Sequence, residues 1–397
     1  MWAGRHVVVG VSGGIAAYKS CHLVRRLTEA GARVDVVLTE GGAEFVRPVT
    51  FEALSGRPVL TSLWEPRRAL AHVRLADEAN LVIVAPATAH LLARVAHGFA
   101  DDLLTTLLLA RTGPVLFAPA MNDAMYAAAA TQQNLALLRE RGLAFVGPET
   151  GALAEGPSER PGRMSEPETI LHHAVRLLYR PGPLAGKRVL VTAGPTREPL
   201  DPVRIITNRS SGKMGFRLAQ AAWYRGAKVT LVTGPSAEPA PVGVVLERIG
   251  TTLEMEQAVS RELPEADVLL MAAAPADYRP ADVLGSKRPR QAGRLLVELC
   301  PTVDILSATL ERRKPGSVTV GFALETGEAE ARARAKLERK GLDLIVVNDA
   351  LEPGAGFEVD TNHVTVLDRE GSRFELPPAS KAEVAEGILD LVEARLA

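Results

Sequence analysis

HVVVGVSGGIAAYK, the stretch from His6 to Lys19, decides the fold of this chain. Its apolar beginning, His6–Val11, predicts a strand that is buried on both faces, as in a parallel sheet. Two glycines follow this strand, and a helical pattern of apolar residues then covers Ala16–Glu29. A strand, a glycine turn and a helix in this order predict the first half of a βαβ unit, and hence an α/β fold.

The alternation of strands and helices continues outward from this stretch. Further strands of the first half are expected at Arg33–Leu38, Leu81–Ala85 and Val115–Ala118, with helices at Ala89–Ala96, Asp102–Ala110 and Asn134–Arg141. After a segment rich in Pro and Gly, Tyr179–Lys187, the pattern restarts. Strands are then expected at Arg188–Thr192, Lys228–Thr233, Val244–Ile249, Val268–Ala272, Val318–Phe322 and Leu344–Val347, with helices at Gly212–Arg225, Leu253–Glu262 and Ala329–Lys340. We therefore predict two Rossmann-like domains, residues 1–180 and 188–397, joined by a linker at 181–187.

The composition of the 397 residues is that of a globular protein, with 47% hydrophobic and 23% charged residues. The net charge is -1, which argues against binding to nucleic acid or to an anionic membrane. Cys21 and Cys300 stand far apart, so neither a disulfide framework nor a zinc site is expected, and a reducing cytosol suits them. No stretch approaches ~18 apolar residues and no leader precedes the first strand, so we expect a cytoplasmic protein without a membrane span.

Three turns made of small residues follow three of the expected strands in the first half. They are Gly13-Gly14, the segment Ala85–Ala89 and the segment Ala118–Asn122. Ligands of open α/β sheets bind at the carboxyl ends of strands, and N–H groups at a helix start attract phosphate, so these turns predict a site for a phosphate-bearing cofactor. Each turn alone could also be an ordinary connection without a ligand. The glycine spacing is not G-x-G-x-x-G, which argues against an NAD-dependent enzyme.

The first half resembles the flavin-containing cysteine decarboxylases, and more narrowly bacterial phosphopantothenoylcysteine decarboxylase. The resemblance rests on SGGIAAYK at Ser12–Lys19, APATA at Ala85–Ala89 and PAMN at Pro119–Asn122, in the order of that family. It implies a flavodoxin-like domain that binds FMN. The implied cofactor contacts are Ser12, Gly13, Gly14, Ile15, Thr39, Thr88, Ala89 and Met121, with Ser12 and Thr88 facing the FMN phosphate.

The resemblance also implies the chemistry of this half. FMN would oxidise the cysteine thiol of the substrate to a thioaldehyde, CO2 would leave, and the resulting enethiolate would be reduced. His72 stands where the family has its active-site histidine, which would help in proton transfer, and Asn122 matches the asparagine that holds the substrate carboxylate. The family's substrate-covering flap carries a proton-donating cysteine, but this chain has Glu155 there. A carboxylic acid whose pKa is raised by burial can donate a proton, yet Glu155 could also be a solvated flap residue.

Two long motifs mark the second half. TAGPTREPLDPVR at Thr192–Arg204 follows a strand, and TNRSSGKMG at Thr207–Gly215 leads into a helix. The second motif brings hydroxyls, free N–H groups and a lysine into one turn, which suits phosphate. It is not a Walker A loop, and on its own it could be only a helix cap. Lys336 and Lys340 are spaced to share one face of a helix, which could also be only a solvated face.

Both motifs resemble phosphopantothenate–cysteine ligase, the partner activity in the same family of fused proteins. The resemblance implies a ribokinase- or Rossmann-like domain in which CTP and Mg2+ activate 4′-phosphopantothenate as an acyl-cytidylate, which cysteine then attacks. Lys287 stands at the family's catalytic lysine, on an expected mobile loop over Arg279–Gly293, and Asn208 at the asparagine that stabilises the acyl-cytidylate. The implied nucleotide contacts are Ser210, Ser211, Gly212, Lys213, Ala273, Ala274, Asp277, Lys287, Val303, Asp304, Ile305, Leu306, Phe322, Lys336 and Lys340. The family's lysine loop reads KIKK, whereas here Arg288–Arg290 reads RPR.

The resemblance further implies assembly, because trimers of flavin domains and dimers of ligase domains would together give a dodecamer. Small-molecule substrates are the expected partners, nucleic acid and membrane are not, and no metal ligands are assigned. Three alternatives stay open: a nucleotide-binding regulator with silent sites, an NAD-dependent dehydrogenase, and a single-activity ligase whose decarboxylase is impaired by Glu155. The joint presence of Asn122, Asn208 and Lys287 argues against the first of these.

Overall fold

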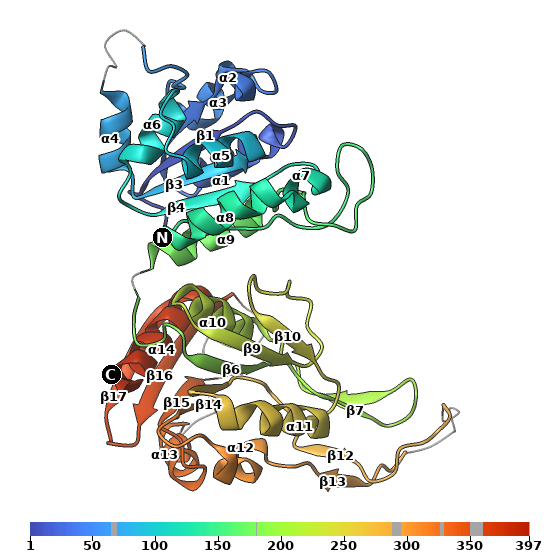
Figure 1. Ribbon diagram of the computed structural model, residues 1–397. Coiled ribbons are helices and arrows are strands. Elements are labelled where there is room, and N and C mark those ends of the chain that lie inside the picture. The colour runs from blue at the N-terminus through green and yellow to red at the C-terminus, as the bar shows by residue number, and fades with distance from the viewer. Residues whose placement is uncertain (65–69, 180, 288–294, 326–328, 350–359, 397) are drawn as a thin grey trace. The chain divides into compact units, whose positions relative to one another are not determined.

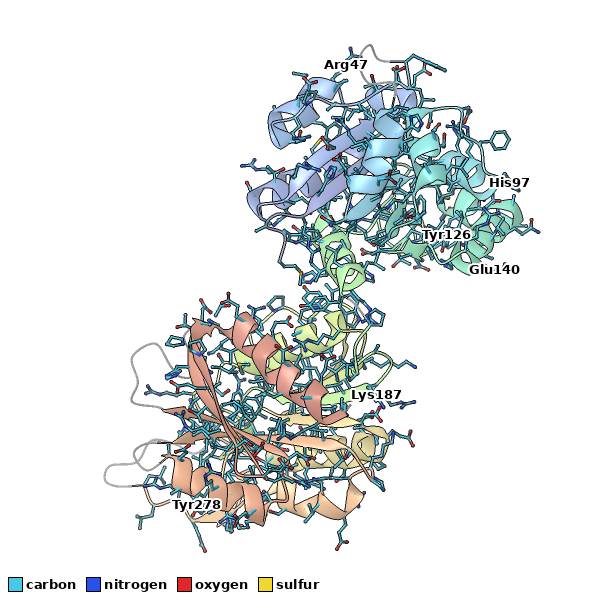
Figure 2. The ribbon with its side chains drawn as sticks, turned by 90° about the vertical axis from the view of Figure 1, so that its left-hand side faces the viewer. Arg47, His97, Tyr126, Glu140, Lys187 and Tyr278 are labelled. Atoms are coloured by element: carbon cyan, nitrogen blue, oxygen red, sulfur yellow. The ribbon has the colours of Figure 1, made fainter. Side chains whose placement is uncertain are left out.

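The structure is a computed structural model that describes residues 1–64, 70–179, 181–287, 295–325, 329–349 and 360–396 (Figure 1). The chain divides into two compact units, Met1–Tyr179 and Arg180–Ala397, which we call unit 1 and unit 2. In each unit, side chains fill the space between a central sheet and the helices on both of its faces (Figure 2).

Unit 1 is built on a five-stranded sheet with the strand order β2-β1-β3-β4-β5. The strands are β1 (His6–Val11), β2 (Arg33–Leu38), β3 (Leu81–Ala87), β4 (Val115–Pro119) and β5 (Ala144–Phe145). All pairs in the sheet are parallel, and the order 2-1-3-4-5 is that of flavodoxin-like folds. The Val-rich strands β1 and β3 are buried along their whole length, as their continuous apolar runs predict.

The helices of unit 1 cover both faces of this sheet. They are α1 (Ala17–Glu29), α2 (Glu40–Ala43), α3 (Pro48–Ser55), α4 (Ala71–Glu78), α5 (Ala89–Ala96), α6 (Leu103–Ala110), α7 (Asp123–Ala127), α8 (Ala129–Glu140) and α9 (Pro167–Leu178). The apolar core on one face is formed with α1, α3 and α9, and the core on the other face with α4, α5, α6 and α8.

Unit 2 has an eight-stranded sheet with the order β10-β9-β6-β11-β14-β15-β16-β17. The strands are β6 (Arg188–Ala193), β9 (Lys228–Thr233), β10 (Val245–Arg248), β11 (Val268–Met271), β14 (Val318–Glu325), β15 (Leu344–Asp349), β16 (Thr361–Asp368) and β17 (Arg373–Ser380). The first six are parallel in the Rossmann order 3-2-1-4-5-6, and β16 and β17 add an antiparallel hairpin at one edge.

The helices of unit 2 also divide between the two faces of the sheet (Figure 1). One core includes α10 (Lys213–Tyr224) and α14 (Lys381–Leu396), and the other includes α11 (Thr252–Glu262), α12 (Ile305–Ala308) and α13 (Ala329–Arg339). Two short antiparallel pairs stand apart from the sheet: β7 (Arg197–Pro199) with β8 (Ile205–Thr207), and β12 (Tyr278–Pro280) with β13 (Leu299–Pro301).

The predicted α/β fold is confirmed, and the expected strands begin and end within a few residues of the observed ones. The expected helix at Asn134–Arg141 is wrong in its beginning, because α8 starts already at Ala129. Its first residues are good helix formers but show no apolar stripe that would mark them. The sequence pattern also missed α3, α4 and α9 in unit 1, and the β16–β17 hairpin with α14 in unit 2.

In each unit the carboxyl ends of the parallel strands meet at one edge, where the strand order changes direction. In unit 1 this switch point lies between β1 and β3, and in unit 2 between β6 and β11. Close approach of backbone occurs at both. A Cβ on Gly13 would lie 2.8 Å from the backbone of Gly41, and a Cβ on Gly215 would lie 2.5 Å from the Cβ of Ala193. These glycines therefore let the chain fold closely around the two edges.

Candidate functional site

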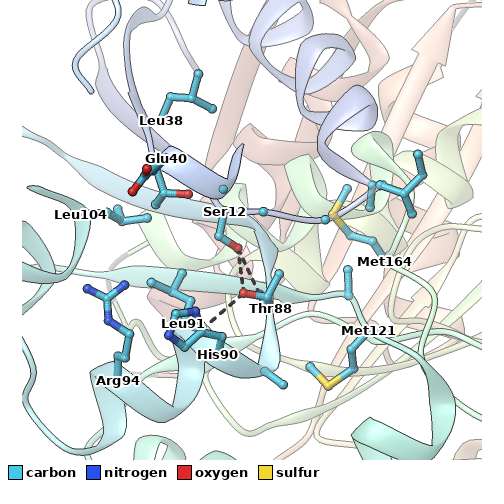
Figure 3. A pocket seen from close by; sticks show the side chains of 18 of the residues that line it. Ser12, Leu38, Glu40, Thr88, His90, Leu91, Arg94, Leu104, Met121 and Met164 are labelled. Carbon is cyan, nitrogen blue, oxygen red and sulfur yellow. Dashed lines mark hydrogen bonds between the residues drawn. The ribbon is translucent and has the colours of Figure 1, made fainter. Parts of the chain in front are cut away.

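A cavity of about 940 Å³ opens at the carboxyl edge of the sheet in unit 1 (Figure 3). The turns after β1, β2, β3 and β4 line it together with the flap segment at 152–155. All the residues that the sequence predicted as cofactor contacts line this cavity: Ser12, Gly13, Gly14, Ile15, Thr39, Thr88, Ala89 and Met121. The predicted catalytic residues Asn122 and Glu155 line it too. The three small-residue turns thus converge on one space.

Ser12 and Thr88 join the first two turns at the floor of the cavity (Figure 3). The Thr88 N–H donates to the Ser12 Oγ at 3.1 Å, and the Ser12 hydroxyl donates to the Pro86 carbonyl oxygen at 2.8 Å. Thr88 is also the N-cap of α5, where its Oγ1 accepts from the N–H of Leu91 at 3.3 Å. Two hydroxyls therefore lie at the N-terminus of a helix, an arrangement that favours an anion.

The glycine turn leaves room for a ligand beside these hydroxyls. Gly13 cannot accept a side chain, because its Cβ would collide with the backbone of Gly41. A Cβ on Gly14 would have ordinary contact, 3.5 Å from Thr88 Cγ2, and would therefore occupy the space in front of Thr88. A phosphate-bearing group fits this cradle, since glycines at a turn expose backbone N–H groups to it.

Asn122 and Glu155 lie next to each other at the wall of the cavity. Asn122 is the N-cap of α7, and its Oδ1 accepts from the N–H groups of Ala124 at 2.9 Å and Met125 at 3.4 Å. Its Nδ2 donates to Glu155 Oε1 at 3.2 Å. Because the cap fixes Oδ1, the NH2 group of Asn122 faces the flap, where an acid stands.

His72 does not join this group within one chain. It lies on α4, is partly buried, and is absent from the residues that line the cavity. Its Nδ1 is buried without a hydrogen-bond partner in the described part of the chain. Sequence reasoning therefore places His72 in the active site, whereas the fold of one chain places it elsewhere.

Several charged residues of this cavity were not predicted. Lys19 is buried, and its Nζ lies 2.9 Å from Glu166 Oε1 and donates to the Met164 carbonyl oxygen at 3.1 Å. Hydrogen bonding from Lys19 is the main cause that lowers the pKa of the Glu166 carboxyl. Arg94 on α5 pairs with Asp102 at 2.8 Å and also with Asp101. Lys19 belongs to the SGGIAAYK motif and could have been found there, but no motif marks Arg94.

A second pocket, of about 400 Å³, lies at the carboxyl edge of the sheet in unit 2. Its lining includes every predicted nucleotide contact except Lys287: Ser210, Ser211, Gly212, Lys213, Ala273, Ala274, Asp277, Val303, Asp304, Ile305, Leu306, Phe322, Lys336 and Lys340. These residues come from the start of α10 and the turn before it, the segment after β11, strand β14, helices α12 and α13, and the residues that adjoin these two helices. The predicted nucleotide contacts of unit 2, apart from Lys287, therefore share one concave space.

The start of α10 forms one wall of this pocket. Gly212 is its N-cap with φ 82°, a left-handed conformation that favours glycine. A Cβ there would also approach the backbone of Gly194 to 3.2 Å. The Ser236 hydroxyl donates to the Ser211 carbonyl oxygen at 2.7 Å and so holds the turn in place.

Both lysines and aspartates line the pocket. Lys336 Nζ donates to the Phe322 carbonyl oxygen at 2.8 Å, and Lys340 Nζ lies 3.0 Å from Asp304 Oδ1. Burial alone would raise the pKa of Asp304, but hydrogen bonding and the charge of Lys340 outweigh burial and lower it. The i, i+4 lysine pair thus faces the pocket, and the interpretation of it as only a solvated face is wrong.

Asn208 and Lys287 stand outside the pocket lining. Asn208 Nδ2 donates to the carbonyl oxygens of Ala274 at 3.2 Å and Pro275 at 3.0 Å, so it adjoins two residues that line the pocket. Lys287 is exposed, and Arg288–Arg290 of the same expected loop lie outside the described residues. One cation of the pocket was missed altogether: Lys381, the first residue of α14, which no sequence motif marks.

Across the described ranges, His, Cys, Asp and Glu side chains do not gather in groups of three or more that could hold a metal ion. Every helix in that part of the chain lacks the length or the apolar character that crossing a membrane requires.

Comparison with known families covers nearly the whole chain. Residues 1–179 match the family described as flavoprotein, and residues 184–396 match the DNA/pantothenate metabolism flavoprotein C-terminal domain. Among solved structures, the chain is similar to a C-terminal domain of CoaBC, with 40% identity over 54% of this chain and 98% of that one and a TM-score of 0.47. It is also similar to a PPC decarboxylase mutant complexed with pantothenoylaminoethenethiol, with 30% identity, coverage of 44% and 97%, and a TM-score of 0.39.

Several full-length relatives carry the name coenzyme A biosynthesis bifunctional protein CoaBC. The protein from Vibrio cholerae is 47% identical over 99% of both chains. The protein from Mycobacterium tuberculosis is 48% identical over 99% of this chain and 97% of its own, and that from Bacillus subtilis is 44% identical over 99% and 98%. These names give no support to a dehydrogenase, a silent regulator or a single-activity ligase. The chain therefore belongs to the CoaBC family of bifunctional enzymes, which joins a flavoprotein decarboxylase to a ligase for two steps of coenzyme A biosynthesis.

Proposed function

We propose that unit 2 ligates 4′-phosphopantothenate to cysteine with CTP, and that unit 1 decarboxylates the product with FMN to give 4′-phosphopantetheine. The observation that carries this proposal is the separation of the predicted contacts. The FMN contacts gather in one cavity at the sheet edge of unit 1, and the nucleotide contacts gather in another pocket in unit 2. Two sites with different lining residues support two reactions rather than one.

In unit 1, the cradle of Ser12, Gly13, Gly14 and Thr88 would hold the phosphate of FMN, because hydroxyls and helix N–H groups converge there. The bound flavin would supply oxidation of the substrate thiol and return of the electrons after CO2 has left. The protein's own part is to bind and orient the substrate beside it. The Asn122 amide, held by its cap bonds, would donate to the substrate carboxylate.

Glu155 would then act as the proton donor of the last step. It lies 3.2 Å from the Asn122 amide, so an acid stands beside the group that holds the reacting end of the substrate. After CO2 leaves, the proton from the Glu155 carboxyl would go to the substrate carbon as the enethiolate is reduced. His72 would assist from a neighbouring subunit, which is consistent with its absence from the cavity of one chain. A trimer of flavin domains, and with dimeric ligase domains a dodecamer, would supply that neighbour.

In unit 2, a carboxylate oxygen of 4′-phosphopantothenate would attack the α-phosphorus of CTP and release pyrophosphate. The cysteine amine would next attack the acyl carbon and release CMP. Lys287 would stabilise the charge that develops in the first step, and the turn at Ser210–Lys213 would bind phosphate. Asn208 would stabilise the acyl-cytidylate. Mg2+ would be bound mainly by the phosphates of CTP. It would retain several of its own water ligands, so one or two protein carboxylates, such as Asp277 or Asp304, would suffice.

A coupled assay with 4′-phosphopantothenate, cysteine and CTP tests the proposal. Purified protein should be yellow and should release pyrophosphate and CMP, followed by CO2 and 4′-phosphopantetheine. Colourless protein that releases pyrophosphate but no CO2 would contradict the decarboxylase half, and yellow protein without pyrophosphate release would contradict the ligase half. Fractionation of the source cells would test the expected cytoplasmic location.

A further inference from the structure

Arg313 joins the ends of two helices, α12 and α13, whose residues line the pocket of unit 2. Its Nη1 donates to the carbonyl oxygen of Gly341 at 2.6 Å, and its Nη2 donates to the carbonyl oxygens of Lys340 and Leu306, both at 3.0 Å. Among the described residues that line the pocket, Arg313 itself is absent. Its connection to the pocket therefore runs through the two helices.

The three carbonyl groups are of the kind that a helix leaves without partners at its end. Leu306 belongs to the short helix α12, and Lys340 and Gly341 directly follow α13. Burial is the main cause that lowers the pKa of Arg313, and the charge of Asp343 opposes this effect. A guanidinium that is removed from water needs hydrogen-bond acceptors, and its planar fork can serve several of them at once. All three bonds form only in one arrangement of the two helix ends.

The same two helices are joined a second time at the pocket. Lys340 Nζ lies 3.0 Å from Asp304 Oδ1, and both residues line the pocket. Asp304 is the N-cap of α12, where its carboxylate accepts from the N–H of Ser307 at 3.4 Å and from the Ser307 hydroxyl at 3.0 Å. Lys340 thus uses its carbonyl oxygen for Arg313 and its ammonium group for Asp304. A shift of α13 relative to α12 would change both contacts.

We propose that Arg313 is a positioning residue for the nucleotide, which holds α12 and α13 in the arrangement that presents Asp304 and Lys340 to CTP. This inference rests on the proposed function of unit 2. Binding groups that are misplaced by about 1 Å lose much of their effect, so Arg313 controls the affinity for CTP without touching it. The chemical step is affected little, because Lys287 and Asn208 belong to other segments of the chain.

The test compares Arg313→Met with Arg313→Lys and with Arg225→Met in the full-length flavin-loaded protein. Arg225 is a matched control, because it is a buried arginine that also joins two helices of unit 2. It forms ion pairs with Glu386 at 2.7 Å, Asp390 at 2.7 Å and Glu393 at 2.8 Å on α14. It follows the end of α10, whereas the pocket is lined by the start of that helix.

Calorimetric titration gives the Kd for CTP, and the rate of pyrophosphate release gives the KM for CTP and kcat. Arg313→Met should raise Kd and KM roughly 10-fold and leave kcat within about twofold of wild type. Arg313→Lys keeps the charge but reaches fewer carbonyl groups, so its Kd should rise less. Arg225→Met should lower the midpoint of urea unfolding and leave the Kd unchanged. An unchanged Kd in folded Arg313→Met, or an equal rise in Arg225→Met, would overturn the proposal.

A double-mutant cycle with Lys340→Met separates positioning from a general loss of stability. Lys340→Met alone should raise the Kd for CTP roughly 10-fold, and the double variant should stay well below the roughly 100-fold rise that independent effects would give. Independent effects would overturn the proposal. If Arg313→Met does not fold, the same cycle with Arg313→Lys decides by the same criterion. Failure of the proposed function is distinct, since wild-type protein itself would then neither bind CTP nor release pyrophosphate.

Discussion

The cavity of unit 1 and the pocket of unit 2 both lie at the switch point of a parallel sheet, but the polar groups that line them differ. In unit 1 the polar groups are the hydroxyls and helix N–H groups at Ser12 and Thr88, and Lys19 forms an ion pair with Glu166. In unit 2 four lysines from α10, α13 and α14 and the residue after α13 surround the pocket. Neutral donors suit a cofactor phosphate that stays in place, whereas point charges suit a triphosphate whose charge shifts during the reaction.

The difference teaches that similar sheets do not determine similar sites. Both units place glycine turns after the first strand, yet the residues that follow the turn decide what can bind. If the contrast is correct, single substitutions should affect one reaction and leave the other intact.

The largest expected effect tests the independence of the two units. Lys287→Gln removes the cation that we assign to the charge of the first ligase step, so pyrophosphate release should fall on the order of 1000-fold. Release of CO2 from supplied phosphopantothenoylcysteine should stay unchanged, as measured with the same purified variant. Loss of both activities in folded protein would mean that the units do not divide the work.

A second substitution separates two steps within unit 1. Glu155→Gln keeps the hydrogen-bonding shape of the side chain but cannot donate a proton as an acid. In a single turnover, with one flavin per substrate, CO2 release should remain and the flavin should stay reduced, while formation of 4′-phosphopantetheine should fall about 100-fold. Chromatography of the products would show an unsaturated thiol accumulating instead. Equal rates of CO2 release and 4′-phosphopantetheine formation would assign the proton to another group, and Glu155→Asp serves as the conservative control.

A third substitution tests the cradle. Gly13→Ala forces a Cβ to within 2.8 Å of the Gly41 backbone, so flavin bound per chain should fall roughly 10-fold, an estimate for about 1.4 kcal/mol of lost binding. Gly14→Ala meets only Thr88 Cγ2 at 3.5 Å and should lose less. Absorbance of the bound flavin measures both, and pyrophosphate release should stay at the wild-type rate. A larger loss in Gly14→Ala would place the tight contact elsewhere.

The last substitution, at Asp35, should have the smallest effect on activity and should change mainly the stability of unit 1 in acid. Burial alone would raise the pKa of Asp35, but hydrogen bonds from His6 at 2.7 Å and Arg57 at 2.7 Å outweigh burial and lower it to about 2. Because the pKa of Asp35 is lower in the folded protein, its carboxylate stabilises the fold above the ordinary pKa near 3.8. This stabilisation is lost as the pH falls through about 2.

Asp35→Asn should reduce the pH-dependent part of the free energy of unfolding by about 1–2 kcal/mol. Urea unfolding of unit 1, followed by the flavin signal between pH 5 and 2, measures it. Wild type should lose more stability over this range than the variant, while activity at neutral pH stays the same. Parallel curves for the two proteins would show that Asp35 is not the group that titrates.

Much of the fold could be predicted because its determinants are local. Strands such as β1 and β3 can be recognised from their continuous apolar runs. Because the carboxyl ends of parallel strands meet at one edge of the sheet, turns that are distant in sequence are then expected to lie together. Asn122 could be assigned to the cavity on this basis, whereas Glu155 could be assigned to it only through the resemblance of its flap. The α4 helix was missed because its short, mixed pattern gives little signal, and with it the position of His72.

Lys381 could not be predicted, because its place depends on topology rather than on a local pattern. It reaches the pocket only after β16 and β17 have paired antiparallel, and no turn or glycine marks it. The side chain of Lys287 likewise belongs to a stretch without strand or helix periodicity, so sequence spacing alone does not place it.

The β16–β17 hairpin determines the direction in which the chain leaves the sheet of unit 2 and enters α14. Strand β16 runs against β15, and β17 reverses again, so the chain leaves the sheet in its original direction. The helix that follows therefore points its amide end, and not its carbonyl end, at the pocket. With one added strand instead of two, the chain would leave the sheet at its opposite edge, and a helix packed back over the sheet would turn its carbonyl end toward the pocket.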